Sequence, residues 1–190
     1  MVPVKSYFVV IAFVSVLGMS LGCGKVGVPG KDGVDGINGT NGTNATVPND
    51  SRVKAHRGSA LTATSATWTT LVFDIVSNDP LSEYNSSTGV FTPTQTGVYS
   101  ISAVFLTESV AWVSGNHCGI GIFIGNTMAT YTRSVMPTAT VYCGAEISTN
   151  LYLTTGQSVT VRLYHDRGSN TGLHAADSSY NNVNISLIRL

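Results

Sequence analysis

Glycine at every third position is the feature of this 190-residue chain that most limits how it can fold. At an average glycine usage of about 7%, seven consecutive hits in register have a chance probability of order 10⁻⁸. Only glycine fits at the axis where three extended chains wind around one another. The period therefore predicts a three-chain helix, whereas a flexible glycine linker would need no period of three. The glycines in register are Gly24, Gly27, Gly30, Gly33, Gly36, Gly39 and Gly42.

The glycine repeat, residues 23–44, is expected to form a short collagen-like stalk. At roughly 3 Å per residue it would be about 60 Å long. It contains a single proline, Pro29, so it should make only a weak triple helix by itself. A neighbouring trimeric part of the chain would have to hold the three strands in register. Residues 45–51 are expected to link the stalk to that part.

Residues 1–22 have the organisation of a signal peptide. Lys5 is the only charge before Lys25, and an apolar run of residues 7–17 is followed by the small residues of segment 18–22. The alternative is an uncleaved membrane anchor, for which the 19-residue uncharged run is barely long enough. Cleavage would place the mature protein in an oxidising space outside the cytoplasm, either secreted or on the cell surface.

Cys23 lies at the junction of the predicted signal peptide and stalk. Cleavage after Gly22 would allow lipid attachment to Cys23, as in bacterial lipoproteins, although Ser20 is a poor match to the aliphatic residue usual in such signals. An interchain disulfide that clamps three stalks is the second alternative, and a cysteine that is removed or unused is the third. A lipid or an uncleaved signal would be the only membrane attachment expected.

The rest of the chain, residues 52–190, is predicted to be all-β. No stretch shows a 3.6-residue period, and short runs of alternating apolar residues are separated by turn residues, as in sandwiches or barrels. The dipeptide Gly125-Asn126 between two such runs predicts a hairpin. The alternating apolar sets are Tyr99, Ile101, Ala103 and Phe105; Cys118, Ile120, Ile122 and Ile124; Val159, Val161 and Leu163; and Val183, Ile185 and Leu187.

A second spacing pattern lies within residues 73–99. It consists of Phe73, Asp79, Tyr84, Phe91, Gly97 and Tyr99. These residues and their intervals resemble the signature of complement C1q-like globular heads, a branch of the tumour-necrosis-factor-like jelly rolls. Segments 84–91 and 151–159 and the last residues are also similar to that family, so the resemblance covers most of residues 52–190. Ile101 and Ala103 depart from the pattern, which prefers aromatics there, and would pack a trimer core with smaller side chains.

The resemblance implies a ten-stranded jelly-roll β-sandwich that assembles into homotrimers, the usual arrangement behind a collagen-like stalk. It implies a non-enzymatic role in recognition or adhesion, with an unknown protein or glycan as ligand. The alternative from another class is a structural coat or fibre component whose head mainly drives trimerisation. A monomeric sandwich that buries the signature aromatics in its own core also stays open.

Charge and composition exclude several classes of protein. The 10 basic and 10 acidic side chains balance, so the chain has no electrostatic footprint for nucleic acid. A hydrophobic content of 43% excludes intrinsic disorder, and only 11% of residues are charged, against about 25% in a typical domain. Such a charge-poor head suits buried surface between subunits. No catalytic motif surrounds the four histidines, so an enzyme and a bound cofactor are not expected.

Two further sites rest on single residue pairs. Cys118 and Cys143 are expected on neighbouring strands, where they would form either a disulfide or two buried thiols. Asp166 and Asp177 flank a polar loop and are weak candidate ligands for calcium. Calcium takes six to eight oxygen ligands, so an ordinary polar loop is the alternative.

Overall fold

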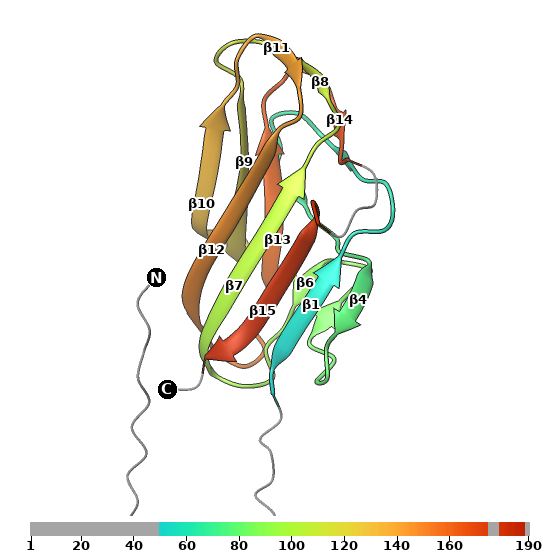
Figure 1. Cartoon of the computed structure of the whole chain (residues 1–190). Coiled ribbons are helices and arrows are strands. Elements are labelled where there is room, and N and C mark those ends of the chain that lie inside the picture. Colours follow the sequence, from blue (N-terminus) through green and yellow to red (C-terminus); the bar gives the residue numbers. More distant parts are fainter. Residues whose placement is uncertain (1–49, 175–178, 189–190) are drawn as a thin grey trace, which may run out of the picture. The chain divides into compact units, whose positions relative to one another are not determined.

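The computed structural model describes residues 50–174 and 179–188, and all of its regular structure in these ranges is β-strand (Figure 1). The chain divides into two units between Asn44 and Ala45, and the described residues all belong to the second. The predicted signal peptide, Cys23, the stalk glycines and Asp177 lie outside the described residues and stay predictions. No helix in the described part of the chain is long and apolar enough to cross a membrane.

Two antiparallel sheets make up most of this unit (Figure 1). In spatial order, the first sheet contains β12 (Gly144–Leu153), β7 (Gly97–Leu106), β15 (Asn182–Ile188), β1 (Arg52–His56) and β4 (Ile75–Asn78). The second contains β10 (Thr127–Val135), β9 (His117–Ile124), β13 (Val159–His165), β6 (Val90–Phe91) and β5 (Tyr84–Asn85), with β3 (Thr69–Thr70) also paired to β13.

Four short strands form two small ladders outside these sheets. They are β8 (Val110–Trp112) with β11 (Ala139–Val141), and β2 (Thr62–Ala63) with β14 (Thr171–Gly172). The described residues therefore form fifteen strands rather than the ten expected. The larger number includes seven strands of only two or three residues.

The core lies between the two sheets and is built by period-two alternation. Successive side chains of a strand point to opposite faces, so every second residue of a half-buried strand is apolar. On β7 the inward residues are at most 4% exposed. The predicted inward sets on β9, β13 and β15 are buried in the same way, apart from the half-buried Ile124 and Leu187 at the strand ends. The predicted alternation is therefore confirmed.

The predicted hairpin is also confirmed. Strands β9 and β10 pair in antiparallel register from Ile124 and Thr127 onward, with Gly125 and Asn126 as the connecting turn. Gly125 has a φ of 60°, which costs little without a Cβ atom and suits the turns that match the twist of paired strands.

The signature aromatics pack inside the single chain. Phe73, Phe91 and Tyr99 are at most 1% exposed, and the rings of Phe91 and Tyr99 meet edge to face at 5.5 Å. Ile101 and Ala103 lie on the same inner face of β7. The expectation that these two residues pack between subunits is wrong, because their side chains point into the sandwich of their own chain.

The polar members of the signature shape a turn next to the core. The carboxylate of Asp79 accepts hydrogen bonds from the backbone N–H groups of Glu83 and Tyr84, each at 2.9 Å. The hydroxyl of Tyr84 accepts the N–H of Phe73 at 2.9 Å. Burial raises the pKa of Tyr84 to about 12, so this hydroxyl stays protonated at neutral pH. These contacts hold the chain where it enters β5.

A disulfide joins Cys118 and Cys143, with their Cα atoms 6.5 Å apart. Of the two alternatives left by the sequence, the structure contains the disulfide. The two cysteines do not lie on neighbouring strands as expected. Cys118 is on β9 of the second sheet, and Cys143 immediately precedes β12 of the first. The bridge therefore ties one sheet to the other.

One carboxylate is buried beside the core. Glu83 is 3% exposed and accepts hydrogen bonds from the backbone N–H and the hydroxyl of Thr94, both at 2.6 Å, and from the hydroxyl of Ser51. These donors satisfy the oxygens of the buried carboxyl group. They also hold the residue that precedes β1 against the segment between β6 and β7.

Candidate functional site

The outward side of β12, β7, β15 and β1 is the first candidate surface, called the uncharged face from this point. Its side chains form rows across the four strands. One row runs from Ser148 through Ser102 and Asn184 to Lys54. The next row along the strands contains Asn150, Ser100, Ser186 and Arg52.

The central strands of the uncharged face, β7 and β15, contribute no charged side chain to it. Charges stand only at its sides, with Arg52 and Lys54 on β1 and Glu146 on β12. The face is hollowed rather than flat. A depression of about 370 Å³ lies between Ser102, Glu146 and Asn182, and another of about 360 Å³ lies between Lys54, Ser77 and Asn184. A hollowed sheet face whose central strands carry no charge is well suited to contact another protein surface.

Strand β10 is an edge strand of the second sheet, and both of its faces are open. All of its residues are exposed except Thr130, which is half-buried. Its inward-facing side thus lacks the cover that β9 and β13 have. Edge strands present unpaired backbone groups and are normally protected by some device. A second chain would be one such cover.

The second candidate surface is a groove on the outward side of β9, β10 and β13, called the aromatic groove. It starts from the sequence of β9, in which every outward residue between His117 and Phe123 is glycine. A Cβ atom at Gly121 would lie 3.1 Å from the ring of Trp68, so only glycine lets this indole lie directly on the strand.

Aromatic rings line the groove. Trp68 packs against Phe123 and Tyr164 with centroid distances of 5.2 and 5.3 Å. On the other side, Tyr131 lies opposite Gly121 in the strand register and is 51% exposed. The hollow between the two sides has a volume of about 600 Å³. Pockets that bind small ligands commonly have volumes of about 300–1,000 Å³.

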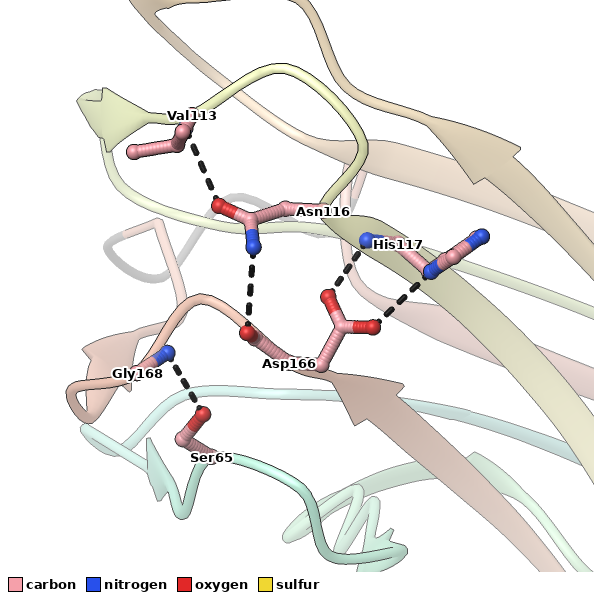
Figure 2. A network of polar contacts seen from close by, with 6 residues as sticks. All are labelled: Ser65, Val113, Asn116, His117, Asp166 and Gly168. Atoms are coloured by element: carbon pink, nitrogen blue, oxygen red, sulfur yellow. Dashed lines mark hydrogen bonds and ion pairs between the residues drawn. The ribbon is translucent and has the colours of Figure 1, made fainter.

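His117 and Asp166 lie at one end of the aromatic groove, and Figure 2 shows the hydrogen bonds between them. The Nδ1 atom of His117 lies 2.8 Å from Oδ2 of Asp166, and the backbone N–H of His117 donates to Oδ1. Burial raises the pKa of Asp166, but the hydrogen bonds from His117 lower it more, so the net pKa is below its usual value. The carboxylate is therefore ionised at neutral pH. Arg133 on β10 adds a cationic side chain to the lining.

The same network fixes the loops around the groove (Figure 2). The side-chain amide of Asn116 donates to the carbonyl of Asp166 at 3.1 Å, and its oxygen accepts the N–H of Val113 at 3.0 Å. The N–H of Gly168 donates to the hydroxyl of Ser65 at 2.8 Å. The last contact holds the segment that carries Trp68 to the loop after β13.

The calcium candidates gain no support from these contacts. Asp166 is engaged with His117, and Asp177 lies outside the described residues. Residues 50–174 and 179–188 contain no group of three histidine, cysteine or carboxylate side chains placed to hold a metal.

Sequence reasoning missed the aromatic groove and found only Asp166 among its residues. Trp68, Gly119, Tyr131 and Tyr164 come from four separate segments, and no short motif connects them. The available signal was the glycine at every second position of an otherwise apolar strand, at Gly119 and Gly121. Such a pattern indicates close approach of another group to the backbone.

No protein-family model matches the chain, and no curated protein matches it in sequence. Solved structures do match. The globular domain of the zebrafish complement 1qA protein is 14% identical with a TM-score of 0.51, covering 74% of this chain and 98% of that one. The Eiger TNF of S. frugiperda is 10% identical with a TM-score of 0.53, covering 74% of this chain and 93% of that one. Murine APRIL is 12% identical with a TM-score of 0.52, covering 73% of this chain and 99% of that one.

At these identities the likeness shows the fold alone. The described residues have the jelly-roll fold of C1q and TNF-family globular domains, as expected from the spacing of the signature residues.

Proposed function

We propose that this protein is a non-enzymatic homotrimer that acts in recognition or adhesion outside the cytoplasm, secreted or tethered to the cell surface. The jelly-roll fold shared with C1q and TNF-family domains supports the class. The glycine repeat supports the number of chains, because a collagen-like helix needs three strands that start together. Residues 45–190 would form the head that aligns the stalks.

The uncharged face is the observation that carries the proposal. Burying a charged side chain without a partner is costly, whereas serine and asparagine can exchange water for hydrogen bonds across an interface. Ser100, Ser102 and Asn184 at the centre of the face therefore suit burial against a second copy. Burial of this face against a second copy also accounts for the low charge content of the head.

The position of the remaining charges fits a closed ring of three. In a ring each subunit contacts its neighbour through two different patches. Lys54 and Glu146 lie on opposite sides of the uncharged face, so one subunit can offer a positive side and the next a negative one. The inward-facing side of β10, opposite the aromatic groove, gives a further surface that a neighbouring subunit would cover.

Trimerisation also gives a reason for the stalk. Three heads that share one stalk bind a surface with an avidity that can exceed the affinity of one head by about 10²–10⁴. A recognition protein of this kind therefore works with weak single sites.

Sedimentation equilibrium of residues 45–190 tests the assembly. We expect the mass of three chains for the unmodified protein and the mass of one chain for Ser102→Arg, which places a charge at the centre of the uncharged face. The matched control is Ser114→Arg, in the exposed loop between β8 and β9, which should remain trimeric. A one-chain mass for the unmodified protein refutes the proposal. Trimers that form ordered layers and bind no ligand favour the coat or fibre alternative.

A further inference from the structure

We propose that the aromatic groove is a carbohydrate-binding site that takes a pyranose ring of a glycan. The residues that carry this inference are Trp68, Gly119, Tyr131, Arg133, Tyr164 and Asp166. It rests on the proposed recognition function, which it deepens by naming the ligand class and its place on the second sheet. The groove belongs to a single chain, so it does not depend on the uncharged face.

The aromatic side chains supply the surface on which a sugar ring can lie. A pyranose has one or two faces of C–H groups and a rim of hydroxyls, so it needs an apolar plate beside polar groups. Tyr131 is 51% exposed, and Trp68 and Tyr164 are half-buried around the same hollow. Tryptophan and tyrosine combine a large apolar ring with a polar atom, which suits both parts of such a ligand.

The ring of Trp68 is held in place by its own chain, without a ligand. Trp68 is fixed between Phe123, Tyr164 and the bare backbone of Gly121, and the bond from Gly168 to Ser65 anchors its segment. A preorganised site avoids the ordering cost of side chains at binding.

The polar end of the groove offers both acceptors and donors. An ionised carboxylate has about four acceptor positions, and the two bonds from His117 to Asp166 leave others for sugar hydroxyls. Arg133 has five N–H donors and forms no ion pair with another residue in the described ranges. A hydroxyl both donates and accepts, so this combination is what a glycan requires.

Two other ligands for aromatic grooves fit less well. A quaternary ammonium group would be attracted by the aromatic rings and by Asp166, but it has no acceptor for the N–H donors of Arg133, whose like charge repels it. A proline-rich peptide offers carbonyl acceptors to Arg133 but few N–H donors to Asp166, and an unpaired buried polar group is costly. A sugar can stack its C–H groups on the aromatic rings and form hydrogen bonds with both Asp166 and Arg133 through its hydroxyls.

The test is binding of the whole chain to an array of immobilised neutral and acidic pyranose glycans. We expect a defined set of glycans to bind, and Tyr131→Ala to reduce that signal at least about tenfold. Tyr142→Ala is the matched control, because Tyr142 is 52% exposed but lies outside the groove. Trp68→Leu and Arg133→Gln should each reduce binding too. Trp68 is not on β10, so its variant separates a loss of ligand contact from a loss of assembly.

The outcomes separate this inference from the proposed function. A trimer that binds no glycan, or whose glycan binding is unchanged in Tyr131→Ala and Trp68→Leu, overturns the groove and leaves the trimer standing. A one-chain mass with glycan binding that is lost in both variants refutes the trimer and supports the groove. Binding of choline-coated beads or a proline-rich peptide instead of any glycan shows that the ligand class is wrong.

Discussion

The disulfide between Cys118 and Cys143 should contribute substantially to the stability of the head. It closes a loop of 25 residues between the two sheets. Restricting a loop of this length in the unfolded chain stabilises the folded state by about 3.5 kcal/mol. We therefore expect the double variant Cys118→Ala/Cys143→Ala to lose about that amount of unfolding free energy.

Urea denaturation measures this loss. For a slope of about 2 kcal/mol/M, a loss of 3.5 kcal/mol lowers the midpoint by about 1.8 M. Both proteins should carry Cys23→Ser, so that a third thiol does not exchange with the pair. Their concentrations should be equal, because the stability of an oligomer depends on concentration. A reducing agent should destabilise the protein with the native pair and leave the double variant unchanged.

A loss below about 1 kcal/mol would refute this reasoning. It would mean that residual structure already restricts the unfolded chain without the bridge, so that closing the loop removes little further entropy.

Three further changes test separate parts of the head. Asp79→Ala removes two backbone-to-carboxylate hydrogen bonds and should lower the unfolding free energy, measured by urea denaturation, by about 2 kcal/mol. Asp79→Asn should lower it less, and equal losses would contradict the role of these hydrogen bonds in holding the turn. Burial raises the pKa of Asp74, but hydrogen bonds from Gly58 and Ser59 lower it more, from 3.8 to about 2. The unfolded chain therefore takes up this proton first, so stability should fall as the pH drops from about 4 to about 2, and Asp74→Asn should flatten that acid slope. Gly121→Ala would place a Cβ atom 3.1 Å from Trp68, costing about 1–3 kcal/mol and shifting the tryptophan emission; an unchanged spectrum and midpoint would show that the indole does not need the bare backbone.

Local patterns in the sequence were enough for the long alternating strands and the main hairpin. The alternation of Tyr99, Ile101, Ala103 and Phe105 indicates which side of β7 is buried, because side-chain direction in a strand is set by backbone sterics alone. The Gly125-Asn126 turn is local in the same sense. The signature spacing also led to the right fold, because Phe73 and Phe91 both lie in the core between the two sheets.

Inferences across segments were less successful. The sequence left the disulfide between Cys118 and Cys143 as one of two alternatives, and wrongly placed the two cysteines on neighbouring strands. It also assigned the subunit contact to Ile101 and Ala103, whose side chains point inward. Spacing along the chain does not say which sheet a strand joins. Nor does it say which of its two faces meets a neighbour.

The sequence by itself determined the all-β class, the strand faces and the three-residue glycine period, since each depends on residues close together in the chain. Only the tertiary structure decided the uncharged face and the aromatic groove. Ser148, Ser102 and Asn184 share a row, and Trp68, Tyr131 and Tyr164 share a hollow, because strand pairing brings distant segments together. That pairing is settled by burial of the whole core rather than by any local preference.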